Sequence, residues 1–177
     1  FEEDPHTGAV IEGFPVTLKV LDSRYYYDLN RPPESCIYDD AWGKKVWAVP
    51  LSEDDREVIK DRHAGYYRVL DALVGELERR FSCCVLYDLH SYNYSRLDGN
   101  PPLFNIGTHY IDKGRYQEAI DNLRDSLGGI LITGTENRAV FDEVFFGKGY
   151  QAAFLKKNHP ESLCLPIELK KVFMDEH

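Results

Sequence analysis

The sequence predicts an α/β domain, in which a mostly parallel central sheet lies between two layers of helices as a three-layer sandwich. Short apolar runs alternate with amphipathic segments along the chain, an order typical of parallel sheets with helical crossovers. The 177 residues fit a single domain that can bury a real core, and we treat 1–177 as one unit. Apolar residues make up 43% and aromatic residues 13% of the chain, which excludes a disordered protein.

Four apolar runs are the expected strands of the central sheet. The run at 83–89 (CCVLYDL) is almost continuous, as in a strand that is buried on both faces. The runs at 16–21 (VTLKVL), 130–133 (ILIT) and 163–169 (LCLPIEL) are shorter or carry single polar residues. A further short strand is possible at 24–29 (RYYYDL), rich in tyrosine.

The expected helices lie between these runs. Ser52 is a typical N-cap residue, and an apolar stripe at intervals of three or four residues follows it as far as Phe81. A second stripe predicts a helix over about 113–127, which the pair Gly128-Gly129 ends. A short helix is expected at about 147–157.

The charge balance limits the classes of partner. Twenty-one basic and 30 acidic residues give a net charge of −9, so the chain has no overall field to attract nucleic acid or an anionic membrane. No stretch of about 20 apolar residues is present, and we expect no membrane association. The four cysteines are few and scattered, which indicates a reducing compartment and predicts a cytoplasmic protein. The sequence leaves the oligomeric state open.

Two candidate catalytic residues lie near the ends of predicted strands, where function gathers in open α/β sheets. His90 directly follows the run at 83–89, where an imidazole can reach a cleft and bind a metal, or form a hydrogen bond at the sheet edge. Glu168 lies inside the last apolar run, where a carboxylate is costly to bury unless it is paired or functional. It can act as a general base or neutralise Lys170 or Lys171.

A third candidate is a group that could bind a carboxylate. Arg24, Asn30 and Arg31 place two guanidiniums and an amide within eight residues of an otherwise acidic chain. Guanidiniums bind carboxylates through two parallel hydrogen bonds. The alternative is a surface ion pair, for example between Arg31 and Glu34.

Several of these residues stand in motifs that resemble the N-formylglutamate amidohydrolase-like family, whose wider relatives include aspartoacylases and zinc carboxypeptidases. The resemblance extends from about residue 2 to residue 176, and DLNR and DLHS in this order are its most specific part. The motifs are Arg24 with DLNR (28–31), DAWG (40–43), DLHSYN (88–93), NIGT (105–108), ENRAVF (136–141) and IELKKVFMDE (167–176).

The resemblance implies a zinc hydrolase on a three-layer, phosphorylase/hydrolase-like α/β fold. In that family His90 would be a ligand of the single zinc ion. Arg24, Asn30 and Arg31 would hold the carboxylate and carbonyl of the substrate. Glu168 would activate the water, which agrees with the roles suggested by the residues themselves.

One departure concerns the first zinc ligands of the family, a histidine and an acidic residue that precede the DLNR segment by a longer stretch. His6 in PHTG imitates this motif but lies close to Arg24, and the string EEDPHT is similar to a later loop of the family. We therefore expect the first zinc-binding segment upstream of Phe1 and further residues after His177. With His90 as the one remaining ligand, we expect the present chain to hold zinc weakly or not at all.

The sequence thus predicts a zinc-dependent amidohydrolase that cleaves the amide bond of an N-acyl amino acid similar to N-formylglutamate. Its partner would be a small-molecule carboxylate substrate. Two alternatives remain: a metallocarboxypeptidase or peptidoglycan-type amidase, and a carboxylate-binding domain without catalytic activity. Zinc content and the choice between peptide and N-acyl amino acid substrates distinguish the three.

Overall fold

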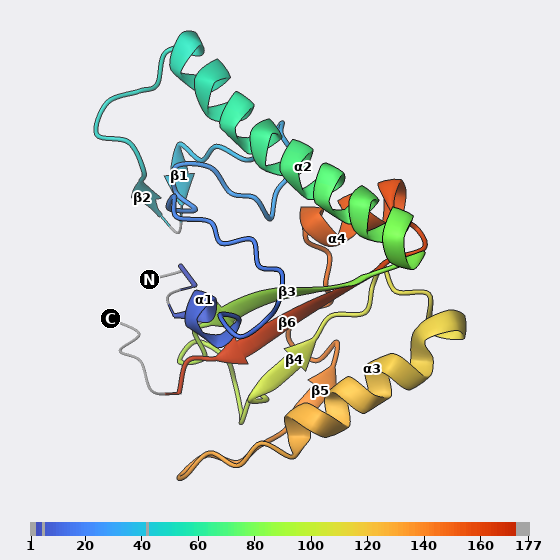
Figure 1. Cartoon of the computed structure of the whole chain (residues 1–177). Coiled ribbons are helices and arrows are strands. Elements are labelled where there is room, and N and C mark those ends of the chain that lie inside the picture. The colour runs from blue at the N-terminus through green and yellow to red at the C-terminus, as the bar shows by residue number, and fades with distance from the viewer. Residues whose placement is uncertain (1–2, 5, 42, 173–177) are drawn as a thin grey trace.

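A four-stranded sheet organises the chain, as Figure 1 shows. The structure, a computed structural model, describes residues 3–4, 6–41 and 43–172. Its helices are α1 (Thr7–Val10), α2 (Glu53–Phe81), α3 (Lys113–Gly128) and α4 (Tyr150–Asn158). Its strands are β1 (Asp40–Ala41), β2 (Lys44–Lys45), β3 (Val85–Tyr92), β4 (Phe104–Ile106), β5 (Ala139–Phe141) and β6 (Leu163–Lys170).

The order of strands in the sheet is β3-β6-β4-β5. β3 pairs with β6 in parallel and β4 pairs with β5 in parallel, whereas β4 and β6 are antiparallel. The prediction of a mixed α/β domain with a mostly parallel sheet is therefore confirmed. The short strands β1 and β2 form a separate antiparallel hairpin outside this sheet.

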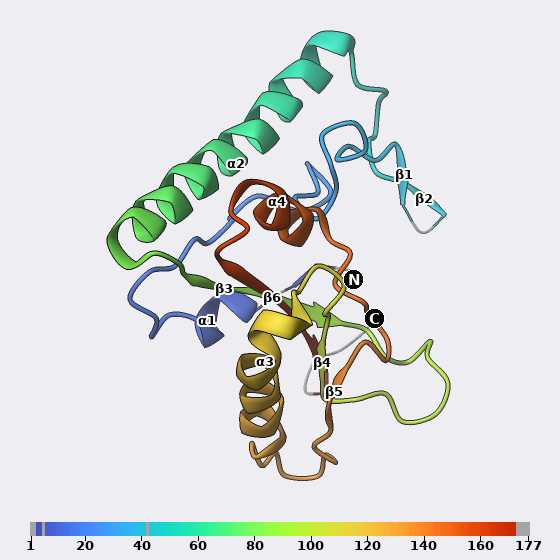
Figure 2. The same ribbon diagram turned by 90° about the vertical axis from the view of Figure 1, so that its right-hand side faces the viewer.

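Side chains along β6 point alternately to the two faces of the sheet, and the two faces pack against different helices. Cys164 packs with Leu70 of α2 and Leu155 of α4, whereas its neighbour Leu165 packs with Ile120 of α3. Successive residues of a strand point to opposite faces, so these helices lie on opposite sides of the sheet. Figures 1 and 2 agree on this arrangement, with α2 and α4 on one side and α3 on the other.

The long elements were predicted correctly. α2 begins directly after Ser52, whose side chain accepts a hydrogen bond from the backbone of Asp55 while the Asp55 carboxylate accepts one from the backbone of Ser52. This reciprocal cap and the apolar stripe fix the position of the helix. α3 and α4 lie where helices were expected, and β3 and β6 match the predicted strands at 83–89 and 163–169 within a few residues.

Three predicted strands are wrong. The segments 16–21, 24–29 and 130–133 have turn or irregular backbone instead of strand. Leu21 is 87% exposed and Leu131 is 93% exposed, so the runs at 16–21 and 130–133 are not buried between helices as the prediction required. Their β-type composition reports local preference only, because a strand also needs a partner for its backbone hydrogen bonds.

The sheet instead includes β4 and β5, which the sequence did not predict. Each has three residues, and each is held mainly by its neighbours in the sheet. Within the part of the chain that the structure describes, no helix combines the length and the apolar character that a membrane crossing requires.

Candidate active site

His90 and Glu168 lie opposite each other on neighbouring strands. The register of β3 and β6 pairs these two residues directly, and Asn105 of β4 is the partner of Glu168 on its other side. Directly paired residues of adjacent strands project to the same face of a sheet, about 5 Å apart. The parallel pairing therefore brings His90, the predicted metal ligand, beside Glu168, the predicted general base, although they are 78 positions apart along the chain.

Asp88 is the nearest polar neighbour of His90 on its own strand. The two residues are separated by one position, so they share a face of the sheet, and Nε2 of His90 lies 3.1 Å from Oδ1 of Asp88. Leu86 lies on the same face and packs against the core under α2 and α4. The site is therefore on the side of the sheet that α2 and α4 cover.

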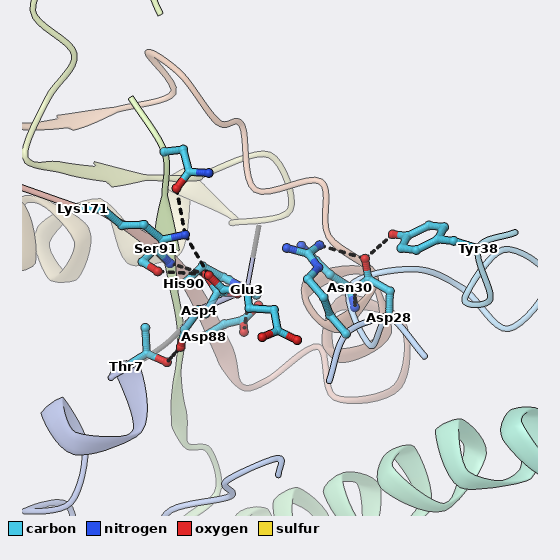
Figure 3. Close-up of polar contacts among 12 residues, drawn as sticks. Glu3, Asp4, Thr7, Asp28, Asn30, Tyr38, Asp88, His90, Ser91 and Lys171 are labelled. Carbon is cyan, nitrogen blue, oxygen red and sulfur yellow. Dashed lines mark hydrogen bonds and ion pairs between the residues drawn. The ribbon is translucent and has the colours of Figure 1, made fainter. Parts of the chain in front are cut away.

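The N-terminal segment supplies a second carboxylate to His90, which Figure 3 shows. Oδ2 of Asp4 lies 3.3 Å from Nδ1 of His90, and Oδ1 accepts hydrogen bonds from the backbone and hydroxyl of Ser91. Nearby, Nζ of Lys171 donates to the carbonyl of Glu3 and to Oδ1 of Asn93. These contacts fix the start of the described chain beside the carboxyl ends of β3 and β6.

Both ring nitrogens of His90 therefore face carboxylates. Partial burial, with the side chain 21% exposed, disfavours the charged imidazolium. The negative charges of Asp88 and Asp4 outweigh this effect and hold the pKa of His90 well above its ordinary value. The two carboxylates thus favour the protonated form of His90, in which both ring nitrogens are donors.

The pKa of Glu168 is raised as well, which in a carboxyl group favours the neutral form. Burial raises its pKa to about 7, and the neighbouring carboxylates of Asp4 and Asp88 act in the same direction, whereas His90 partly counteracts them. A carboxyl group that gains and loses its proton near neutral pH can accept a proton from water and return it to a leaving group. The environment of Glu168 thus suits acid–base chemistry.

A second polar group is built around Asp28, and Figure 3 shows it beside the first. Asp28 is 2% exposed and accepts hydrogen bonds from Nη2 of Arg24 at 2.8 Å and from the hydroxyl of Tyr38. Its other oxygen accepts the backbone N–H of Asn30 at 2.8 Å. Burial acts to raise the pKa of Asp28, but the Arg24 guanidinium outweighs it and the pKa is lowered. Asp28 therefore fixes the position of Arg24.

Asn30 is held by the N-terminus of α4. Its carbonyl accepts the backbone N–H of Tyr150. Its side-chain oxygen lies so close to Gly149 that a Cβ atom there would be 1.8 Å away. Arg31 points elsewhere: the residue is exposed, and its Nε donates to the hydroxyl of Tyr38 at 3.4 Å.

These groups border a cavity of about 660 Å³, within the range of about 300–1,000 Å³ that is usual for small-molecule sites. The structure brings Arg24, Asn30 and His90 to its wall, whereas Arg31 and Glu168 are not lining residues. Glu168 lies next to this wall as the strand partner of His90. The predicted residues thus occupy one region, except Arg31.

Three polar residues of this region were not candidates from the sequence. Asp88 belongs to the motif DLHSYN and to an Asp-x-His spacing that puts both side chains on one face of a strand, but only His90 of this pair was given a role. Asp4 lies 86 positions from His90, and Gln151 of α4 reaches the cavity only through the packing of that helix. No local pattern marks either of the last two.

The resemblance implies zinc, so the donor set must be compared with a zinc site. Catalytic zinc usually has three protein ligands and an open position. Within 3–4, 6–41 and 43–172, no group of three His, Cys, Asp or Glu side chains is arranged to hold a metal ion. Both nitrogens of His90 are already engaged by Asp4 and Asp88. The described residues, as they are arranged, do not fit a three-ligand zinc site.

Comparison with protein families gives a match over residues 1–172 to the model described as N-formylglutamate amidohydrolase. The chain belongs to this family. The resemblance in the DLNR and DLHS motifs is thereby confirmed, and N-formylglutamate amidohydrolases are hydrolases by their description. A search of the curated proteins finds no match to the chain.

Among solved structures, a gene product of Agrobacterium tumefaciens matches this member of the N-formylglutamate amidohydrolase family with a TM-score of 0.61. The two sequences are 18% identical, so the match supports the fold alone. It covers 84% of this chain and 57% of the Agrobacterium chain. The present chain therefore spans little more than half of that protein.

Proposed function

We propose that this chain carries the substrate-binding and acid–base residues of an amidohydrolase that cleaves N-acyl amino acids with a free carboxylate, similar to N-formylglutamate. The observation that carries the proposal is the direct pairing of His90 with Glu168 beside a cavity that also contains Arg24. Family membership supplies the reaction class.

Each residue has a role in this proposal. Arg24, held in place by Asp28, binds the carboxylate of the substrate, and the Asn30 side chain adds a polar contact on the same wall. Glu168 accepts a proton from the attacking water as the C–O bond forms, and returns it to the amine as the amide C–N bond breaks. His90, the strand partner of Glu168, partly offsets the rise in the pKa of that carboxyl, which helps Glu168 to lose its proton again.

Zinc dependence and a cytoplasmic location are further parts of the proposal, on the basis of the resemblance and of the cysteine content. His90 is the donor that this chain would contribute to a zinc ion. To do so it would have to exchange one carboxylate partner for the metal. Metal content of the purified chain, measured by mass spectrometry with His90→Ala for comparison, tests this part independently of activity.

Glu168→Gln tests the acid–base role, with Glu118→Gln on the exposed surface of α3 as the matched control. We expect Glu168→Gln to lower the turnover of N-formylglutamate by about 10²–10⁴-fold, the usual contribution of a general base. The control should keep full turnover. Equal activity of the two variants would contradict the role of Glu168. Substrate binding without any turnover by the unaltered chain would instead favour a carboxylate-binding domain.

A further inference from the structure

A second cavity, of about 280 Å³, lies between the N-terminal segment, α2 and β3. No charged side chain lines it among the described residues, whereas the first cavity has several of both signs. Its lining residues that do not also border the first cavity are mostly apolar: Phe14, Pro15, Val16 and Thr17 of the N-terminal segment, Leu70, Leu73, Val74 and Leu77 of α2, and Cys84, Val85 and Leu86 at the start of β3.

The two cavities share part of their walls. Ile11, Leu18, Tyr66, Tyr87 and Gln151 border both of them, so the apolar cavity adjoins the cavity that contains Arg24 and His90. A ligand with one charged end and one apolar end could therefore occupy both at once.

A hydrogen-bond donor lies at this junction. The hydroxyl of Tyr66 donates to Oε1 of Gln151 at 2.5 Å, which fixes the orientation of the side-chain amide. Gln151 is only 8% exposed, and its Nε2 makes no hydrogen bond with the described residues. Gln151 lines both cavities, so this N–H₂ group can donate a hydrogen bond to a ligand oxygen there.

We propose that the apolar cavity binds the acyl chain of the substrate, and that the preferred substrates are N-acyl amino acids with an extended apolar acyl group. This inference rests on the proposed function. The amino-acid carboxylate would bind near Arg24, the acyl carbonyl would accept a hydrogen bond from Gln151, and the hydrocarbon would lie against Leu73 and Leu77. A formyl group has no carbon beyond its carbonyl and cannot reach the second cavity.

The chain-length dependence of binding tests the inference. We would titrate the purified chain calorimetrically with N-formyl-, N-butanoyl- and N-octanoylglutamate. Each methylene group transferred into an apolar pocket should tighten Kd by about fourfold, the equivalent of about 0.8 kcal/mol. Burial of only two methylene groups would already give about sixteenfold, so we expect N-octanoylglutamate to bind more than about tenfold more tightly than N-formylglutamate. Equal Kd values for all three would overturn the inference and leave the proposed hydrolysis of N-formylglutamate intact.

Variants locate the binding of the acyl chain. Leu73→Trp should fill the cavity, and Val16→Asp should place a charge in its wall. Because Val16 is 49% exposed, its substitution should leave folding intact. Both variants should bind N-octanoylglutamate less tightly and should bind N-formylglutamate with unchanged affinity. Val69→Trp, on an exposed part of α2 outside both cavities, is the matched control.

The outcomes separate the two proposals. Selective loss of the octanoyl preference in both cavity variants supports the acyl pocket. An octanoyl preference that survives in both variants overturns it, because the chain then binds elsewhere. Failure of the unaltered chain to bind any of the three ligands overturns the acyl pocket and the proposed function together.

Discussion

Asp28→Asn should destabilise the fold and release Arg24 from its position in the cavity. The carboxylate is almost fully buried and accepts three hydrogen bonds, from the Arg24 guanidinium, the Tyr38 hydroxyl and the Asn30 backbone. An asparagine has one acceptor oxygen and one N–H₂ group, so it can keep the bond to Asn30. Its N–H₂ group would then face two other donors.

The size of the effect follows from the contacts that are lost. A hydrogen bond to a charged group contributes about 1.5–3 kcal/mol and one between neutral groups about 1 kcal/mol. The bonds from Arg24 and Tyr38 both go to the charged carboxylate, so their loss adds up to about 3–6 kcal/mol. The Arg24 side chain is 25% exposed, so water can solvate part of the freed charge. We therefore expect the free energy of unfolding to fall by less than this sum, about 2–4 kcal/mol.

Urea unfolding at pH 7, followed by circular dichroism, measures this change. Asp39→Asn is the matched control, because Asp39 is exposed and pairs with Arg56 at the surface, where an ion pair contributes at most about 1 kcal/mol. A loss below about 0.5 kcal/mol for Asp28→Asn would refute the reasoning, since a buried carboxylate with a charged partner should cost more. The variant should also bind N-formylglutamate less tightly.

The same contacts predict a dependence on pH. Arg24 holds the pKa of Asp28 below its ordinary value of 3.8, so the unfolded state binds more protons than the folded state in acid. The stabilisation by Asp28 is complete above this pH and is lost as the pH falls through the folded pKa. The difference in stability between the unaltered chain and Asp28→Asn should therefore shrink below pH 3.8. A constant difference down to strongly acidic pH would contradict this.

Two further predictions concern the loop behind β4. Gly107→Ala should lower the free energy of unfolding, measured by thermal unfolding, by about 1–3 kcal/mol or more, because the new Cβ would lie 2.3 Å from the backbone of Gly147. In the control Gly13→Ala no atom lies within 4 Å of the new Cβ, so stability should change little. Asn105→Ala should lower stability by about 2–4 kcal/mol and expose 143–145 to limited proteolysis, because the buried Asn105 amide binds the backbone of these residues. Unchanged proteolysis would show that another contact holds this loop.

The sequence by itself determined the long elements and the two strands that carry the catalytic candidates. The Ser52 cap and the apolar stripe of α2 act within a few residues, so they can be recognised without the rest of the fold. Continuous apolar runs likewise located β3 and β6, and therefore His90 and Glu168. The positions of these helices and strands follow from short-range hydrogen bonds and from the spacing of apolar residues along the chain.

The sequence could not determine which short apolar segments join the sheet. The segment 130–133 has a stronger β-type composition than β5, yet it is irregular, and the Asn137 side chain donates to the carbonyls of Leu127, Gly128 and Ile130 beside it. β4 forms between antiparallel β6 and parallel β5, and β5 forms at the edge of the sheet against β4. Strand formation depends on these distant partners, which local composition does not report.

The tertiary structure alone decided the composition of the candidate site. The register of β3 against β6 places Glu168 opposite His90, and a shift of one residue would have directed Glu168 to the α3 side. Packing of the N-terminal segment and of α4 brings in Asp4 and Gln151, whereas Arg31 is exposed and donates to Tyr38. These contacts join residues far apart in the chain, because burial of apolar faces, and not local sequence, sets how the elements meet.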